Sequence, residues 1–239
     1  MSAAPQTLYE TIEVTWPCAS SVRLGPFTIR DGAGGGKRVS AATAEAEVAE
    51  GDLAKAEEAM VRLEQPTLFM IRKGDTALDA LLAERGYSVI DPVNIYLAPV
   101  APLAAAGLPR GRTFTIWEPL QIMRDIWAEG GIGPARVAVM VRAGCPKTGL
   151  FGRYGNRPSA AGYVGLNHAF AMVHALQVRP RDRRCGMGRL MMQQAARWAK
   201  AEGAEQLAVM CTQANVAANA LYASMGFDAV GGYHYRIKG

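Results

Sequence analysis

Apolar residues recur along the chain with two periods, one of two residues and one of three to four residues. The first period predicts half-buried strands and the second predicts helices that bury one face. In the first part of the chain, strands are expected at residues 11–16, 27–30, 67–72 and 93–97, and helices at 52–63 and 76–85. Further along, helices are expected at 119–129, 188–201 and 216–225, and strands at 148–153, 162–169, 171–178, 206–212 and 233–238. The pattern predicts an α/β (α+β) protein whose mixed, mostly antiparallel sheet is flanked by helices.

Alanine, proline and glycine gather between residues 98 and 112, which predicts a linker. We therefore expect one domain at residues 1–100, a linker at 101–111 and a second domain at 112–239. The two parts also end alike, because residues 80–87 and 220–227 each read as a helix, a glycine and an aromatic residue. This similarity favours a duplicated fold.

Composition and charge narrow the choice of ligand. The chain has 239 residues, of which 50% are hydrophobic, and a formal net charge of +5. Much of the basic excess falls in one short stretch, which contains Arg179, Arg181, Arg183, Arg184 and Arg189 against Asp182 alone. A compact cluster suits a phosphate-bearing small molecule better than nucleic acid, which needs a broad basic face.

Neither a membrane segment nor a metal site is expected. No apolar run approaches the roughly 20 residues that a spanning helix needs, and no secretory signal opens the chain. Cys18, Cys145, Cys185 and Cys211 are scattered, without a CxxC pair or clustered histidines, which disfavours structural zinc. A cytoplasmic protein with free thiols is the expectation.

The segment from Val178 to Leu190 carries the strongest chemical signal. A strand ends at Val178, a basic turn follows, and a helix begins at Gly186-Met187-Gly188. Glycines let backbone N–H groups converge on one point, and a helix start adds unpaired N–H donors and a positive dipole end. A Gly-x-Gly pair can also be an ordinary strand-to-helix turn, but the arginines favour a phosphate site.

A second signal lies one helix and one strand later. Asn215-Val216-Ala217-Ala218-Asn219-Ala220-Leu221-Tyr222 continues to Gly226-Phe227. Tyr222 by itself could be a half-buried core aromatic, and the functional interpretation depends on its order after the arginine-rich turn.

Together these segments resemble the GNAT (GCN5-related) N-acetyltransferases. Arg183-x-x-Gly186-x-Gly188, preceded by Val178-x-Pro180, is similar to the pyrophosphate loop of that family. Asn215-x-x-Ala218-x-x-Leu221-Tyr222 is similar to its second signature. The resemblance covers the second half of the chain, whereas the first half resembles the degenerate module of tandem GNAT proteins. It has Leu82 where the second half has Tyr222, and its plausible role is to shape the acceptor pocket.

The resemblance implies acetyl-CoA as the acyl donor and assigns residues to it. The expected cofactor-binding residues are Leu176, Gln177 and Val178 for the pantetheine arm, Arg183, Arg184, Cys185, Gly186, Met187, Gly188 and Arg189 for the pyrophosphate, and Asn215 and Asn219 near the pantetheine. Tyr222 is expected to protonate the departing thiolate as general acid, with direct transfer and no acyl-enzyme.

The general base is left open. Many relatives have a glutamate on the strand at 171–178, where this chain offers His174 instead, with His168 on the preceding strand as a second choice. Either histidine could equally be structural. Glu118, Glu129 and a chain of water molecules are further alternatives. Cys185, beside a helix start and several arginines, could be a nucleophile, but no His–acid partner is near it in sequence.

The resulting hypothesis is acetyl transfer to a primary amine, most simply a small molecule, by a monomer or homodimer. A non-catalytic acyl-CoA-binding protein is one alternative, favoured if Tyr222 lies away from the cofactor. An enzyme acting on a protein N-terminus or a charged tRNA is another, favoured by a broad basic surface. Gly34-Gly35-Gly36-Lys37 does not fit a P-loop, because Asp31 and Arg38 occupy the positions of its first glycine and its Ser/Thr.

Overall fold

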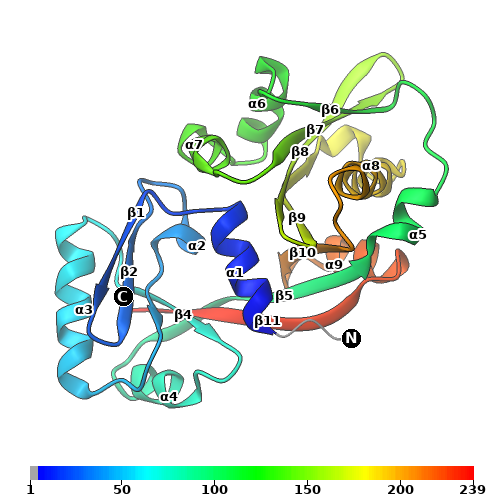
Figure 1. Ribbon diagram of the computed structural model, residues 1–239. Helices are drawn as coiled ribbons and strands as arrows, with labels where there is room; N and C mark the ends of the chain where they lie inside the picture. The colour runs from blue at the N-terminus through cyan, green and yellow to red at the C-terminus, as the bar shows by residue number, and fades with distance from the viewer. Residues whose placement is uncertain (1–4) are drawn as a thin grey trace. The chain divides into compact units, whose positions relative to one another are not determined.

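The computed structural model describes residues 5–239 and divides them into two compact units (Figure 1). The larger unit contains residues up to Pro17, Ile95–Cys211 and Asn215–Val230. The smaller unit contains Cys18–Asn94, Thr212–Ala214 and Gly231–Gly239. Both units are discontinuous in sequence, and their limits differ from the expected domains at 1–100 and 112–239.

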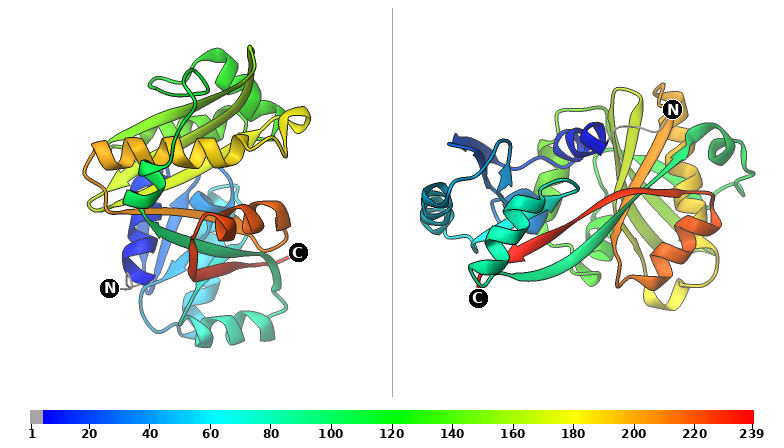
Figure 2. Two further views of the ribbon diagram at one scale, coloured as in Figure 1. Left: turned by 90° about the vertical axis from the view of Figure 1, so that its right-hand side faces the viewer. Right: turned by 90° about the horizontal axis from the view of Figure 1, so that it is seen from below.

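The larger unit consists of one sheet with helices on both faces. Its elements are α1 (Pro5–Thr15), α5 (Val100–Ala105), β6 (Thr113–Ile116), α6 (Gln121–Glu129), α7 (Pro134–Arg142), β7 (Lys147–Tyr154), β8 (Arg157–Asn167), β9 (Phe170–Val178), the 3₁₀ turn η1 (Pro180–Asp182), α8 (Met187–Ala201), β10 (Gln206–Thr212) and α9 (Val216–Ser224). The last residue of β10, Thr212, is assigned to the smaller unit. Helix α8 lies across β7, β8 and β9 (Figure 2). Helices α1 and α6 contact β8 and β9.

The sheet of the larger unit is mostly antiparallel, as predicted. Strands β6 to β9 form an antiparallel meander, and β9 then pairs in parallel with β10. The meander begins where Thr113 is opposite Gly152 and ends where Asn167 is opposite Phe170. The parallel pairing is possible because α8 provides the crossover between β9 and β10.

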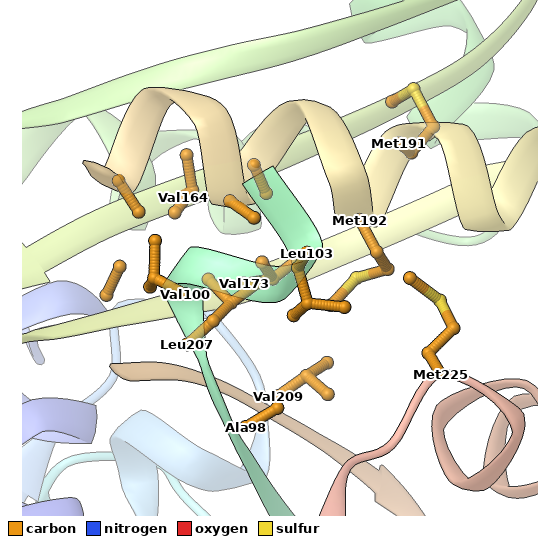
Figure 3. Packing of buried hydrophobic residues seen from close by; sticks show 14 of the residues in the cluster. Ala98, Val100, Leu103, Val164, Val173, Met191, Met192, Leu207, Val209 and Met225 are labelled. Atoms are coloured by element: carbon orange, nitrogen blue, oxygen red, sulfur yellow. The ribbon is translucent and has the colours of Figure 1, made fainter. Parts of the chain in front are cut away.

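The main hydrophobic core lies between this sheet and α8. Apolar residues of α8 are buried against the strands and against α5, as Figure 3 shows for Met191, Met192, Val164, Val173 and Leu103. Arg197 of α8 reinforces the contact with α5, because its side chain donates hydrogen bonds to the carbonyl oxygens of Ala104 and Ala106 at 3.3 and 3.0 Å. The segment predicted as a linker is therefore part of this core.

The smaller unit has its own core. Its elements are β1 (Ser20–Leu24), β2 (Phe27–Asp31), α2 (Lys37–Ser40), β3 (Thr43–Ala44), α3 (Glu50–Arg62), β4 (Leu68–Arg72) and α4 (Thr76–Glu84). Strands β1, β2 and β3 form an antiparallel sheet. Phe27, Leu53, Met60 and Phe69 lie at the centre of a separate buried cluster.

The last strand of each half is shared between the units. In β5 (Ser88–Pro99), the residues from Ile95 onward belong to the larger unit, where β5 is the neighbour of β10. In β11 (Asp228–Ile237), the residues from Gly231 onward belong to the smaller unit, where Tyr233–Ile237 pair with Leu68–Arg72 of β4. Each unit thus contains a strand from the other half of the sequence.

Residues 11–16 were expected to form a strand, and this prediction was wrong. They belong largely to helix α1, whose buried residues Leu8, Ile12 and Thr15 follow helical spacing. The β-branched residues misled the prediction. Two threonines fit the helix because each side chain donates to the carbonyl four residues earlier, Thr11 to Thr7 at 2.8 Å and Thr15 to Thr11 at 2.6 Å.

The described residues contain no helix that is both long and apolar enough to cross a membrane.

Helix α7, which begins at Pro134, was not predicted. Its start follows from the proline, whose fixed φ angle suits the first turn of a helix.

Leu103→Ala tests whether the presumed linker belongs to the core. We expect the variant to lower the free energy of unfolding by about 2–4 kcal/mol, because Leu103 is 8% exposed and a buried leucine leaves a cavity when truncated. Denaturant unfolding measures the change. Leu120→Ala is the matched control, since Leu120 is 44% exposed and should lose no more than about 0.5 kcal/mol. Equal losses in the two variants would contradict the packing of α5.

Candidate active site

The site begins where strands β9 and β10 separate. Their parallel register ends at Val209 opposite Val173, while β9 continues to pair with β8 as far as Val178. Between these points β9 contains a bulge, at which Ala175 has a φ of 51° and the register with β8 shifts. Within the described residues, the last part of β9 therefore has a neighbouring strand on one side only.

The turn after β9 leads into the start of α8. Gly186 is the N-cap of this helix and has a φ of 77°, a conformation that glycine adopts without strain. A methyl group on Gly186 would meet no atom within 4 Å, so the backbone here faces open space. The second glycine has another role, because a Cβ on Gly188 would lie 2.9 Å from Leu221 of α9. Gly186 exposes the helix start, and Gly188 lets α8 and α9 pack closely.

Positively charged side chains strongly outnumber negatively charged ones on this turn. Its only acidic residue, Asp182, is 1% exposed, and its Oδ1 accepts a hydrogen bond from Arg157 at 3.2 Å. Arg181 lies 3.7 Å from its other carboxylate oxygen. Two arginines thus compensate the buried carboxylate, while Arg183, Arg184 and Arg189 add positive charge beside the helix start. An anion placed there would meet both the arginines and the positive end of the helix dipole.

A cavity of about 630 Å³ joins these features. It is lined by the end of β9, the arginine-rich turn, the first turn of α8 and one face of α9. The lining residues are Leu176, Gln177, Val178, Asp182, Arg183, Arg184, Gly186, Met187, Gly188, Arg189, Asn215, Ala217, Ala218, Ala220, Leu221, Tyr222 and Ser224. Most residues expected to bind the cofactor are therefore brought together, although Cys185 and Asn219 are not in the lining.

The two asparagines of α9 differ in role. Asn215 is the N-cap, because its side-chain oxygen accepts a hydrogen bond from the Ala218 N–H at 3.1 Å. Asn219 lies one turn later, and its Oδ1 accepts a hydrogen bond from the Tyr96 hydroxyl at 2.7 Å. Asn215 reaches the cavity, whereas Asn219 connects α9 to β5.

Tyr222 lies at the buried end of the lining, on α9. It is 4% exposed, and its ring packs between Tyr96 and Phe227 at centroid distances of 5.6 and 5.9 Å. Burial raises the pKa of the Tyr222 hydroxyl above its ordinary value, with Cys211 and Tyr96 as smaller contributions. Burial also raises the pKa of the neighbouring Cys211 thiol to about 11. The Tyr222 hydroxyl is consequently protonated at neutral pH, and Tyr222 belongs to the lining of the cavity.

His174, the expected base, is placed differently. It is 4% exposed and is absent from the lining of the cavity. Its Nε2 lies 2.8 Å from Thr15 Oγ1, and its ring stacks on Trp16 at a centroid distance of 5.0 Å. Helix α1 thus covers His174. No local pattern of residues indicates this contact, because 159 residues separate the two hydrogen-bonded side chains.

The other candidates for the base are scattered. His168 is exposed in the turn between β8 and β9. Glu118 is exposed beside β6. Glu129 is held by Arg179, whose guanidinium donates two hydrogen bonds at 2.6 and 2.8 Å and lowers the pKa of this carboxyl. The structure does not bring these groups to one place.

Two further observations concern chemistry that sequence alone left open. Among residues 5–239, no group of three or more His, Cys, Asp or Glu side chains could hold a metal ion. The face of α9 that carries Ala217, Ala218 and Leu221 lines the cavity, a role the sequence analysis did not assign. Its small residues, spaced for one face of a helix, were the available signal.

Comparisons with known proteins agree with this geometry. A sequence model of the acetyltransferase (GNAT) family matches residues 127–227. The chain is 26% identical over 236 residues to the uncharacterized N-acetyltransferase YobR of Bacillus subtilis. This match covers 94% of each of the two chains.

Solved structures show the same fold. A GCN5-related N-acetyltransferase from Kribbella flavida has a TM-score of 0.77 at 15% identity, covering 100% of this chain and 97% of the other. A tandem GNAT protein from the clavulanic acid biosynthesis pathway has a TM-score of 0.66 at 13% identity, covering 99% and 89%. The arginine-rich turn, the separated ends of β9 and β10 and the tyrosine of α9 thus all lie within residues 127–227, the part of the chain that matches the acetyltransferase (GNAT) family model.

Proposed function

We propose that this protein transfers an acetyl group from acetyl-CoA to a primary amine, most simply that of a small molecule. The observation that carries the proposal is one cavity, lined by the arginine-bearing start of α8, by a stretch of β9 that pairs with β8 but not with β10, and by Tyr222. Each of these features suits a different part of an acyl-CoA molecule.

The phosphates would bind at the start of α8. Arg183, Arg184 and Arg189 supply positive charge, and Gly186 leaves the first backbone N–H groups of the helix open to an anion. The pantetheine arm would lie along Leu176, Gln177 and Val178, where its amides can pair with the strand backbone as an added strand would. The apolar face of α9 would pack against the other side of the arm.

The chemical step would be a direct transfer. The neutral amine nitrogen forms a bond to the thioester carbonyl carbon, the carbon–sulfur bond breaks, and the departing sulfur takes the proton of Tyr222. The amine nitrogen releases one proton to solvent, and the Tyr222 phenolate takes one proton from solvent, so atoms and charges balance. The raised pKa of Tyr222 suits this role, because the hydroxyl is still protonated when the thiolate forms.

The position of Tyr222 favours catalysis over simple binding of acyl-CoA. A binding protein would be the better proposal if this hydroxyl lay away from the cavity, but Tyr222 belongs to its lining. Within the described residues, no hydrogen bond holds the hydroxyl elsewhere. His174 remains a predicted base, and the proposal does not depend on it, since an amine that arrives neutral needs no base before attack.

The first test concerns the phosphate site. Coenzyme A at about 100 times its Kd should stabilise the wild type by about 2.7 kcal/mol and raise its Tm by roughly 5–10 °C. Gly186→Ala should lose most of this shift, since the methyl group enters the space where the phosphate would bind and strains the backbone at a φ of 77°.

Gly203→Ala is the matched control for this test. Gly203 follows the other end of α8, has a φ of 89° and likewise meets no atom within 4 Å. Both variants should lose similar intrinsic stability, roughly 1–2 kcal/mol from the left-handed backbone. Only Gly186→Ala should lose the response to coenzyme A. An equal response in both variants would place the phosphates elsewhere.

Tyr222→Phe tests the acid. Thiol release from acetyl-CoA, measured with a panel of primary amines, should fall by about 100-fold or more, while the Kd of coenzyme A stays within about twofold. Tyr154→Phe removes a phenol outside the cavity and should keep wild-type turnover. Undiminished turnover in Tyr222→Phe would assign the proton to water or to another group. Absence of thiol release from wild type with every amine would favour a macromolecular acceptor or a binding protein.

The pH profile gives an independent test of the same role. Burial favours the neutral phenol, so the pKa of Tyr222 in the folded protein exceeds the ordinary value of 10.0. We therefore expect turnover to rise with pH as the amine loses its proton, without a descending limb below about pH 10. A descending limb below that pH, present in the wild type and missing in Tyr222→Phe, would show that Tyr222 ionises too early to act as the acid.

A further inference from the structure

Trp127, on the last turn of α6, binds the strand that forms the cavity without lining the cavity itself. Its side chain is fully buried. The indole Nε1 donates a hydrogen bond to the carbonyl oxygen of Ala175 at 2.9 Å. The accepting residue is the bulge residue of β9, directly before the three residues that line the cavity.

The bulge has a backbone conformation that needs support. Ala175 has a φ of 51°, in the left-handed region that disfavours residues with a Cβ. Such a conformation persists where surrounding contacts fix it. The hydrogen bond from Trp127 is a contact of this kind, because it holds the carbonyl of the bulge peptide in one orientation.

Fixing this carbonyl also fixes the amide that follows it. In a planar trans peptide the C=O and N–H groups point in opposite directions, so the Leu176 N–H points away from Trp127 and α6. Helices α6 and α8 cover opposite faces of the sheet, since Gly149 approaches Met123 of α6 while Gly152 approaches Met187 and Met191 of α8. The Leu176 amide is thereby turned from the α6 face, and the cavity includes Leu176 and the start of α8.

The end of α6 makes a second contact with the same stretch of β9. A Cβ on Gly130 would lie 2.4 Å from the side-chain carbon Cδ of Gln177, so Gln177 packs directly on the glycine. The end of α6 thus contacts both Ala175, which directly precedes the lining residues of β9, and Gln177, which is one of them.

We propose that Trp127 is a positioning residue for the acyl-CoA arm. By holding the Ala175 carbonyl, it sets the direction of the Leu176 amide and the separation of β9 from β10, so that the pantetheine arm can pair with β9. This inference rests on the proposed function, because it requires coenzyme A to bind in the cavity. The inference predicts that loss of the Trp127 hydrogen bond weakens the binding of the pantetheine arm and leaves the binding of the phosphates unchanged.

The experiment compares two ligands in Trp127→Phe, which keeps an aromatic ring but has no N–H donor. Calorimetry should show the Kd of coenzyme A raised by about 3- to 10-fold. A change of this size corresponds to the loss of one hydrogen bond, here the one that positions the Ala175 carbonyl. The Kd of adenosine 3′-phosphate 5′-diphosphate, which lacks the pantetheine arm, should change less than about twofold. Trp198→Phe, a change of the same kind on α8, should alter neither value.

A measurement on the wild type covers the case in which Trp127→Phe does not fold. The chain has four tryptophans, so a ¹⁵N-labelled sample gives four indole N–H signals, and the Trp→Phe variants at positions 16, 117 and 198 assign the fourth to Trp127. Coenzyme A should shift the Trp127 signal, and adenosine 3′-phosphate 5′-diphosphate should not.

The outcomes separate the two proposals. Weakening of both ligands to the same degree in Trp127→Phe, or equal shifts of the indole signal with both ligands, would overturn the positioning role alone. A wild type that binds neither ligand would overturn the proposed function and this inference with it.

Discussion

The backbone of β9 beyond Val173 has β8 on one side and, among the described residues, no strand on the other. Backbone N–H and C=O groups that are removed from water need hydrogen-bond partners, so an edge of this kind requires either solvent or a ligand that can pair with it. The bulge at Ala175 lies where this edge begins, and it is accompanied by a shift in the register between β8 and β9. The cavity, the positions of Leu176 to Val178 and the access to Tyr222 all depend on the separation of these two strands.

The main hydrophobic core and the cavity meet at the start of helix α8. Helix α8 packs across β7, β8 and β9 and begins at the cavity, so burial of its apolar face also places the arginine-rich turn. Gly188 allows α9 to approach α8, and that approach brings Tyr222 to the lining. Packing and the proposed binding of coenzyme A therefore share the same short segment, from Arg183 to Arg189.

Predictions from the sequence succeeded best for structural features that depend on residues close together in the chain. The helix start at Gly186-Met187-Gly188 and the helix that follows Asn215 are local features, and residue types at fixed spacing indicated both. The strands of the meander and the helices α8 and α9 were predicted for the same reason, since each shows its own hydrophobic period. Helix α1 was missed because its β-branched residues favour a strand, and only its packing on β8 and β9 selects the helix.

The sequence by itself determined the GNAT signatures and the mostly antiparallel α/β class, because these follow from residue types a few positions apart. Tertiary structure alone decided that α5 belongs to the core, that each unit contains a strand from the other half, that Thr15 meets His174, and that Trp127 holds the Ala175 carbonyl. Each of these features joins side chains or strands that are far apart in the chain. Such contacts arise from the way the whole core closes, and no local pattern of residues encodes them.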